Sequence, residues 1–339
     1  MTILITGATG FVGRNLLLAV LESKRYEKIY LPVRSRAKLV AQLKEDGFAA
    51  VPGSLVINEA SATDWKLGEA AKADHVVHSA GVIFARTKEE YWDTNIEGTV
   101  RLMKALQSPK KVVVLSSLAA AGPSSVDNPR QENQTEAPVT WYGQSKLDME
   151  KRLAKEFSHL PYICLRPPMI FGARDHATLP LFKMVRKPVH FKAGFNTKYY
   201  SVLSVEDLCG AILAALEKPF TGNRIYFVAH NAVITDRDLL RSAAEVCGCK
   251  SRVLAVPQWA LKVASHMVDS IPTWRTTIPS LSVDRAKEIW PDRWVVSSAS
   301  FEKDFGWTAR MPFREALSRT RDWYIKRDRK STRLNSSHG

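Results

Sequence analysis

Three glycines follow the first apolar run of the chain, and this feature constrains the fold more than any other. The run Ile3–Ile5 leads into TGATGFVG at residues 6–13, after which leucines and valines recur at helical spacing from about Phe11. A strand, a glycine turn and a helix form the context of a dinucleotide-binding βα unit, whose helix N-terminus receives a pyrophosphate. The alternative is a tight turn in which glycine only supplies unusual backbone angles.

Apolar runs and helical patterns alternate through the rest of the first half. This alternation predicts an α/β fold with a Rossmann-type, doubly wound parallel sheet. Pro32 argues weakly against a central position for the second strand. After the first strand, which begins at residue 2, we expect strands at Lys28–Val33, Ala49–Val51, Asp74–His78, Lys111–Leu115 and Tyr162–Leu165, and helices at Glu89–Leu106 and Tyr142–Phe157.

The alternation loosens from about Arg166, where prolines and tryptophans become frequent. We therefore expect a dinucleotide-binding domain at residues 1–165 and, at 166–325, a smaller mixed substrate-binding lobe that returns strands and helices to the core. Tryptophans can line pockets for apolar ligands, although most tryptophans in a small lobe pack in its core. The segment from Trp259 to Val268 could form an amphipathic lid or touch a membrane surface, and a core-packed helix is the simpler interpretation. The tryptophans concerned are Trp259, Trp274, Trp290, Trp294, Trp307 and Trp323.

The composition narrows the classes of partner. The chain has 339 residues and a formal net charge of +15, part of which comes from the basic end after Lys326. No long Lys/Arg block with interleaved aromatic residues is present, so we expect no nucleic-acid partner. No run of about 18 apolar residues occurs, so no membrane span is expected. Residues 326–339 are basic and polar, and we expect this tail to be disordered or to come from vector or read-through sequence.

Cysteine usage and the start of the chain point to the cytoplasm. Cys247 and Cys249 are too close for a routine disulfide, and no nearby Cys/His set completes a metal site. We therefore expect these thiols, with Cys164 and Cys209, to stay reduced in a reducing compartment, and we expect no metal. The first strand is expected to begin at residue 2, so we expect no signal or transit peptide.

A second informative stretch is TWYGQSKLDME, which carries Tyr142 and Lys146. Residues four apart lie on one face of a helix, so both side chains can reach the same ligand. A lone pair of this kind also occurs on ordinary exposed helices. Here the pair follows a strand that ends in Ser116 and Ser117, at the expected number of βα units after the glycine turn.

Together these motifs resemble those of the extended short-chain dehydrogenase/reductase superfamily, which includes NAD(P)-dependent epimerases and dehydratases. The resemblance covers residues 2–325. In relatives, the two long helices beside the active site pair across a twofold axis, so the resemblance implies a homodimer through Glu89–Leu106 and Tyr142–Phe157. Besides the glycine turn, the matching motifs are His78-Ser79-Ala80-Gly81, Asn95-x-x-Gly98-Thr99, Ser116-Ser117, Tyr142-x-x-x-Lys146, Arg166-Pro167 through Phe171-Gly172, and Ser204-Val205-Glu206-Asp207-Leu208.

The resemblance implies a catalytic set of Ser117, Tyr142 and Lys146. A phenol with a pKa of about 10 is a poor base at neutral pH, and an ammonium one helical turn away favours the phenolate. Tyr142 would then exchange a proton with the substrate oxygen, while Lys146 also holds the nicotinamide ribose and Ser117 bonds the same oxygen. Ser117 is chosen over Ser116 because it lies five residues before Gly122, the family's usual offset. Asn95 is either a support for this set or a structural hydrogen-bonding residue.

The loop after the second strand favours NADP(H) as cofactor. Relatives that prefer NAD place an acid there to bind the ribose 2′-hydroxyl, whereas this loop carries basic residues and no acid before Glu45. Guanidinium groups suit a 2′-phosphate, although a solvated basic loop is the alternative. The adenine contact is open between Ser54 and Asp64. The predicted cofactor contacts are Thr6, Gly7, Thr9, Gly10, Phe11, Val12, Gly13, Arg34, Arg36, Ser54, Leu55, Ser79, Ala80, Gly81, Tyr142, Lys146, Pro167 and Ile170.

Three functions are compatible with these residues. The preferred one is an oxidoreductase that interconverts a ketone or aldehyde and an alcohol on a fairly apolar small molecule, similar to the dihydroflavonol-reductase-like and 3β-hydroxysteroid-dehydrogenase-like branches. The second is a sugar-nucleotide epimerase or dehydratase, and the third is a non-catalytic NADP-sensing protein. The segments Arg166–Phe171 and Lys198–Ser201 depart from sugar-nucleotide patterns. The presence of both Tyr142 and Lys146 argues against a sensor without catalysis.

Overall fold

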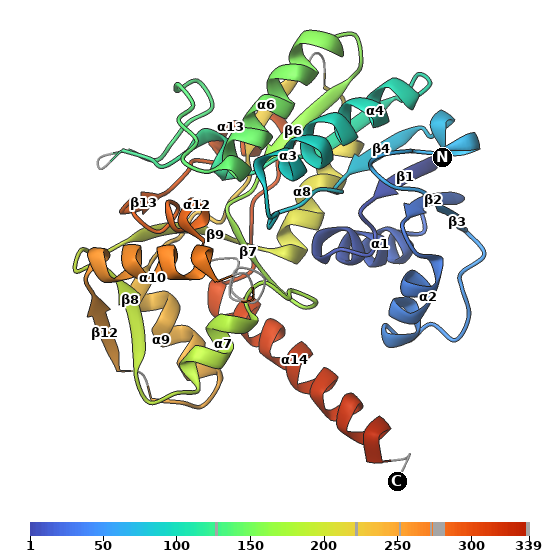
Figure 1. Cartoon of the computed structure of the whole chain (residues 1–339). Coiled ribbons are helices and arrows are strands. Elements are labelled where there is room, and N and C mark those ends of the chain that lie inside the picture. Colours follow the sequence, from blue (N-terminus) through green and yellow to red (C-terminus); the bar gives the residue numbers. More distant parts are fainter. Residues whose placement is uncertain (126–127, 221–222, 251, 272, 274–281, 337–339) are drawn as a thin grey trace.

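Seven parallel strands form the central sheet of the protein. The computed structural model describes residues 1–125, 128–220, 223–250, 252–271, 273 and 282–336. Within the sheet the strand order is β10-β6-β5-β4-β1-β2-β3, which confirms the predicted Rossmann-type fold (Figure 1). The strands are β1 (Thr2–Thr6), β2 (Lys28–Val33), β3 (Leu55–Glu59), β4 (His75–His78), β5 (Lys111–Leu115), β6 (Tyr162–Arg166) and β10 (Arg224–Phe227).

Both faces of this sheet are buried, which explains why its central strands read as continuous apolar runs. Ile3 and Ile5 contribute to one hydrophobic cluster with helices α1 and α8, whereas Leu4 faces the opposite cluster with α4 and α6. The strand order reverses beside β1, which opens a crevice at the carboxyl ends of β1 and β4. The helices on the two faces are α1 (Phe11–Ser23), α2 (Arg36–Glu45), α3 (Lys88–Tyr91), α4 (Gly98–Ala105), α6 (Trp141–Glu156), α8 (Val205–Glu217) and α13 (Ala299–Phe305), with the short η1 (Gly68–Lys72) and α5 (Leu118–Ala121).

The third strand corrects the prediction from sequence. No strand forms at Ala49–Val51, and β3 begins at Leu55, after a turn in which the Leu55 N–H donates to the Pro52 carbonyl at 3.0 Å. Because β3 is an edge strand with partly exposed and polar residues, it lacks the apolar run that identified the others. Pro32 is tolerated in β2 because the β1–β2 register ends at Tyr30.

The predicted helix Glu89–Leu106 forms as three consecutive segments. A π-helical turn, η2 (Trp92–Glu97), joins α3 to α4. Such turns insert an extra residue into a helix and often occur at functional sites. The predicted helix Tyr142–Phe157 corresponds to α6.

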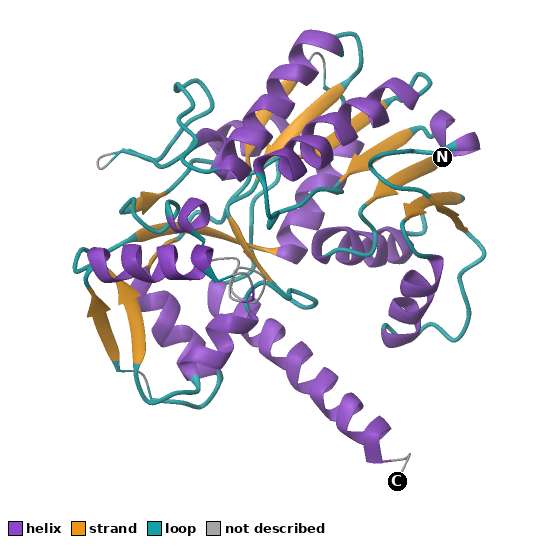
Figure 2. Ribbon diagram, in the orientation of Figure 1, coloured by secondary structure: helices purple, strands orange, loops and turns teal. Residues whose placement is uncertain are grey.

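The second lobe lies against the carboxyl edge of the sheet and contains both strands and helices (Figures 1 and 2). Residues 166–325 also return β10, α8 and α13 to the first lobe. The elements of the second lobe are β7 (Met169–Phe171), β8 (His190–Ala193), β9 (Tyr199–Ser204), β11 (Val233–Thr235), β12 (Val253–Val256), β13 (Arg293–Trp294), α7 (Leu179–Val185), α9 (Asp236–Val246), α10 (Gln258–Ser270), α12 (Val283–Ala286) and α14 (Phe313–Ser336).

Helix α10 and the end of the chain differ from the expectations. The indole of Trp259 is 70% exposed, so α10 is not core-packed along its whole length as predicted, and Trp274 lies outside the described residues. The expected tail starts within α14, whose helix runs to Ser336, and residues 337–339 lie outside the described part. Among the described helices, none is long and apolar enough to cross a membrane.

Candidate active site

The glycine turn brings the backbone at Gly7 into close contact with the start of α1 at Gly13 and with the segment after β4 at Ser79 and Ala80. Gly7 has φ +74°, and a Cβ there would lie 2.7 Å from the Ala80 nitrogen. A Cβ on Gly13 would lie 2.2 Å from the Gly7 carbonyl oxygen. Helix α1 then begins after Gly10, with no side chain capping its first N–H groups. Any residue larger than glycine would fill the space at Gly7 and Gly13, and the adjoining helix N-terminus has free N–H groups. This glycine cradle therefore fits the pyrophosphate of a dinucleotide.

A buried hydrogen-bond network fixes the strand ends beneath this cradle. The Thr6 hydroxyl lies 2.7 Å from His78 Nδ1, and His78 Nε2 lies 2.9 Å from the Thr99 hydroxyl. Ser79 donates its hydroxyl to the Thr6 carbonyl at 2.7 Å. Burial lowers the pKa of His78 to about 3, so the imidazole is neutral and positions the turn without exchanging protons in the working pH range.

Ser117, Tyr142 and Lys146 line one cleft of about 620 Å³. Ser117 caps the short α5 directly after β5, and Tyr142 lies in the first turn of α6. The two helices approach closely at Gly143, where a Cβ would lie 2.4 Å from the Ala119 carbonyl oxygen. This close packing is what brings the serine and the tyrosine together.

The electrostatics of this set differ from the expectation from sequence. Burial raises the pKa of Tyr142, while a hydrogen bond with the Ser117 side chain and the charge of Arg285 oppose the rise. Burial also lowers the pKa of Lys146 to about 8, and its ammonium donates to the Leu115 carbonyl at 2.8 Å. The predicted lowering of the Tyr142 pKa is therefore wrong for this structure, because burial dominates and Lys146 is not among the groups that shift this pKa.

Asn95 has a structural role in the described contacts. Its side chain accepts from the Val82 N–H at 2.9 Å and donates to the Val82 carbonyl at 3.1 Å. The same amide donates to the Ser145 hydroxyl at 3.0 Å. Asn95 lies in the π-helical turn and so ties a cleft-lining loop to α6. Of the two roles left open by the sequence, these contacts favour the structural one.

The basic loop after β2 lies beside the glycine turn. Gln42 of α2 donates its side-chain amide to the Thr9 carbonyl at 3.1 Å, which joins the two. Arg34 and Arg36 are exposed, and the Arg36 guanidinium donates to the Ile57 carbonyl at 3.1 Å. Glu59 accepts from the Arg36 N–H at 3.0 Å. Glu59 was not identified from the sequence, because only the pairing of β2 with β3 brings it to the loop.

The predicted adenine contacts Ser54 and Leu55 are not brought to the cleft. Leu55 pairs with Ile29 at the start of β2, whereas Val33 pairs with Glu59 at its end. In a parallel sheet these are opposite edges, so Ser54 and Leu55 lie at the amino edge, away from the glycine turn. The alternative residue Asp64 follows the carboxyl end of β3.

Most other predicted contacts do meet in one place. Thr6 is fully buried beneath the turn, and Ala80 donates its N–H to the Thr6 hydroxyl at 3.3 Å. The predicted residues that line the cleft are Gly7, Gly10, Phe11, Val12, Gly13, Ser79, Gly81, Ser117, Tyr142, Lys146, Pro167 and Ile170.

Two charged residues of the second lobe, Arg285 and Glu288, line the cleft beside Tyr142 and were missed from sequence. The Arg285 guanidinium lies 5.2 Å from the ring centre of Tyr142 and donates to Glu288 at 2.8 Å. Glu288 in turn accepts from the Thr140 hydroxyl, at 2.9 Å, and burial raises its pKa. No local motif marks these residues as part of the site, because Tyr142 and Thr140 lie more than a hundred positions away in the chain.

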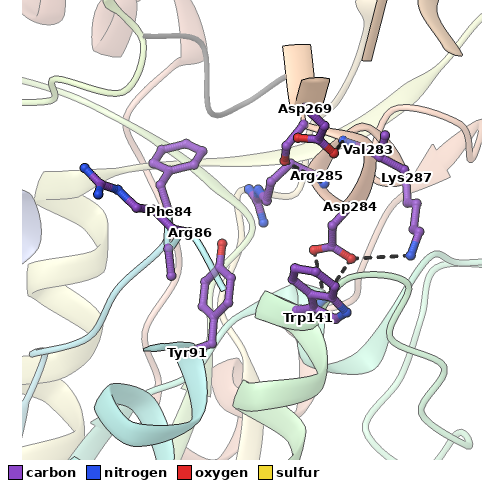
Figure 3. Close-up of a pocket in the computed structure, with 11 residues that line it drawn as sticks. Phe84, Arg86, Tyr91, Trp141, Asp269, Val283, Asp284, Arg285 and Lys287 are labelled. Carbon is purple, nitrogen blue, oxygen red and sulfur yellow. Dashed lines mark hydrogen bonds and ion pairs between the residues drawn. The ribbon is translucent and has the colours of Figure 1, made fainter. Parts of the chain in front are cut away.

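A second cavity of about 340 Å³ adjoins the cleft, and Phe84 and Arg285 line both (Figure 3). The Trp141 N–H donates to both carboxylate oxygens of Asp284, at 3.2 and 3.0 Å. A carboxylate at a helix N-terminus is favourable. Helix α12 is thereby fastened to the start of α6, where Tyr142 lies.

Comparison with known proteins places the chain in a family. Residues 3–229 match the NAD dependent epimerase/dehydratase family. The chain is 26% identical over 322 residues to the ceramide reductase of Caulobacter vibrioides (strain NA1000 / CB15N), covering 94% of this chain and 93% of that protein. It is 27% identical over 286 residues to the 4-hydroxy-2-methyl-3-oxo-4-farnesyl-3,4-dihydroquinoline-1-oxide ketoreductase of Stigmatella aurantiaca, with 82% of each covered.

Sugar-nucleotide enzymes are also similar. A UDP-glucose 4-epimerase of Vibrio cholerae is 28% identical over 273 residues, covering 77% of this chain and 80% of that protein. The solved structure of MoeE5 in complex with UDP-glucuronic acid and NAD has a TM-score of 0.73 at 20% identity, covering 96% and 99% of the two chains. The structural match shows a shared fold.

Proposed function

Since the chain belongs to the NAD dependent epimerase/dehydratase family, we propose that it interconverts a ketone or aldehyde and an alcohol on a molecule with a large apolar part, using NADP(H). The observation that carries this proposal is the meeting of Ser117, Tyr142 and Lys146 in one cleft that also contains the glycine cradle. When bound, the nicotinamide supplies or accepts the hydride.

The side chains of this set handle the proton. The raised pKa of Tyr142 keeps the phenol protonated at neutral pH, so it can donate to a substrate oxygen that gains negative charge. Ser117 would bond the same oxygen and orient it. Lys146 is held beside Gly81 and would face the ribose of the cofactor; a Cβ on Gly81 would lie 3.4 Å from its ammonium nitrogen.

One part of the cleft lining, made of aliphatic and aromatic side chains, supports an apolar substrate. Aliphatic and aromatic side chains favour burial of hydrocarbon. The names of two relatives, the ceramide reductase and the farnesyl-bearing ketoreductase, point the same way. The apolar lining residues are Val82, Ile83, Phe84, Leu118, Met169, Ile289 and Trp294.

The NADP preference rests on the basic loop. Arg34 is exposed and makes no ion pair with any described residue, so its guanidinium is available to a 2′-phosphate. We expect NADPH to bind at least about tenfold more tightly than NADH, from one charge-assisted bond. Fluorescence titration of both cofactors tests this, and Arg34→Asp should reduce or reverse the preference. The matched control is Lys72→Asp, an exposed site before β4, which should change neither; a wild-type preference for NADH would contradict the proposal.

The second candidate function is a sugar-nucleotide epimerase, which the 28% identity to UDP-glucose 4-epimerase favours. An oxidoreductase consumes NADPH in proportion to product, whereas an epimerase moves the hydride twice and shows no net absorbance change. A panel of ketones, aldehydes and UDP-sugars, followed by NADPH absorbance and product analysis, separates the two. An NADP-sensing protein without catalysis would bind cofactor and turn over nothing in the panel.

We also infer a homodimer in the cytoplasm. Helices α4 and α6 pack side by side within the chain and offer the surface that relatives use for twofold pairing. All four cysteines are free thiols, which suits a reducing compartment. Light scattering at micromolar concentration should give twice the chain mass of 38.0 kDa.

A further inference from the structure

Helix α10 presents large apolar side chains to solvent. Trp259, Val263 and Met267 recur every four residues and therefore share one side of the helix, while Ser265 and Val268 are buried against the lobe. The three apolar side chains are between 49% and 70% exposed. In the usual amphipathic arrangement large apolar groups face only the core, whereas in α10 they also face solvent.

The neighbouring strands add to the same surface. Phe191 and Leu254 are paired across β8 and β12, and both are more than half exposed. Lys192 points the other way, toward α9, where its ammonium meets Asp236 at 2.7 Å. Phe195, just beyond β8, is 72% exposed.

The strand pair and the helix are joined where β8 ends, because a Cβ on Gly194 would lie 3.5 Å from the Gln258 side chain at the start of α10. Figure 1 shows β8, β12 and α10 together at the outer end of the second lobe. We call this surface the docking face, defined as Phe191, Phe195, Leu254, Trp259, Val263 and Met267.

Exposed cations predominate in the chain segments that supply the docking face. The segments 176–205 and 246–268, which supply the face and its surroundings, contain no Asp or Glu. Lys192 and Lys198 are paired with Asp236 and Asp292. The exposed cations of the two segments are Lys183, Arg186, Lys187, Lys250, Arg252 and Lys262.

We propose that the docking face binds peripherally to an anionic lipid bilayer. Tryptophan and aliphatic side chains on one side of a surface helix, bordered by lysine and arginine, match the chemistry of the boundary between lipid headgroups and acyl chains. The alternative occupant, a second copy of this chain, would bring cations against cations across a twofold axis. Charge complementarity therefore favours the bilayer.

The docking face has a consequence for substrate access that rests on the proposed function. Asp269, at the carboxyl end of α10, lines the second cavity, whose Phe84 and Arg285 also line the catalytic cleft. A substrate with an apolar chain would thus enter from the bilayer through this cavity. Docking itself requires neither cofactor nor substrate.

Vesicle co-sedimentation tests the proposal. Wild-type protein should bind vesicles of phosphatidylglycerol mixed equally with phosphatidylcholine, and bind pure phosphatidylcholine vesicles much more weakly; added salt should weaken the first. The triple variant Trp259→Ser, Val263→Ser, Met267→Ser should lose more than about tenfold in affinity, because the buried apolar area is gone. Lys262→Gln should lose about fivefold, as expected for one surface cation.

Matched controls come from other exposed positions. Val56→Ser on β3 and Lys303→Gln on α13 should leave vesicle binding unchanged. Circular dichroism and NADPH titration should show that the triple variant is folded. The proposal is overturned if wild type does not bind the anionic vesicles, if the triple variant binds them equally well, or if that variant instead dissociates a lipid-free dimer. Failure of the proposed function would leave the vesicle result unchanged, so the two are distinguishable.

Discussion

The two lobes contribute to one cleft by different physical means. In the first lobe, backbone segments touch so closely that Gly13 has no room for a Cβ beside the Gly7 carbonyl. In the second, a long side chain, Arg285, reaches across to the ring of Tyr142. The first kind of contact forbids nearly every alternative residue, whereas the second can be replaced by other side chains. Contacts that tolerate only one residue leave a local pattern in the sequence, and tolerant ones do not.

The largest expected effect lies in the first lobe. Tyr142→Phe should reduce turnover by about 10²–10⁴-fold, because the proton of a positioned group is lost. Cofactor affinity should stay nearly intact, since the ring and its packing remain. Steady-state kinetics on an established substrate and NADPH titration measure the two quantities. Near-full activity in this variant would remove Tyr142 from the proposed proton relay.

The parts of the fold and of the site that depend on residues close together in the sequence could be predicted. Five of the seven strands of the main sheet, the close packing at the glycine turn and the pair Tyr142–Lys146 all follow from short spacings. Strand β10, which returns from the second half of the chain, was not predicted. The edge strand β3 could not be predicted, because a half-exposed strand carries a weak apolar signal. Arg285 and Glu288 could not be predicted, because tertiary packing of α12 on α6 places them. The order of pKa effects at Tyr142 also depends on burial, which short spacings do not give.

Replacing Arg285 tests the contribution of the second lobe. Arg285→Gln should reduce kcat by about tenfold, the rate equivalent of a desolvated cation–π contact. Because the Arg285 charge opposes the rise in the Tyr142 pKa, its removal should raise that pKa further. The limb of the pH profile for alcohol oxidation should then move to higher pH. A variant of the neighbouring exposed residue, Lys287→Gln, is the control; equal effects in both variants would indicate general loosening of α12.

The smallest expected effect concerns stability. Burial lowers the pKa of Lys146 to about 8, so the folded protein holds this proton less tightly than the unfolded chain, and the protonated form costs stability. Lys146→Met removes that cost but leaves the Leu115 carbonyl without its donor, for a net gain of about 1–2 kcal/mol below pH 8. We expect Tm to rise by about 2–4 °C at pH 7.

The pH dependence gives this prediction its sign. The gain should be complete below about pH 8 and should disappear as the pH approaches the ordinary lysine pKa of 10.5, where the unfolded chain also loses the proton. Thermal unfolding at several pH values measures it, with exposed Lys151→Met on the same helix as control. A loss of stability of Lys146→Met at pH 7 would mean that the contacts of Lys146 stabilise the folded protein by more than the burial of its charge destabilises it. In either case, turnover and cofactor binding should fall.

The Asn95 amide has a consequence for how the cleft moves. Strand β4 ends at His78, yet the N–H and the carbonyl of Val82 are both satisfied by one side chain, as a neighbouring strand would satisfy them. The Asn95 side chain thus bonds both backbone groups of Val82 as a residue of a paired strand would, although Asn95 itself lies in a helical turn. The cleft wall at Val82 is therefore anchored to the π-helical turn, and a shift in that turn would move this part of the wall with it.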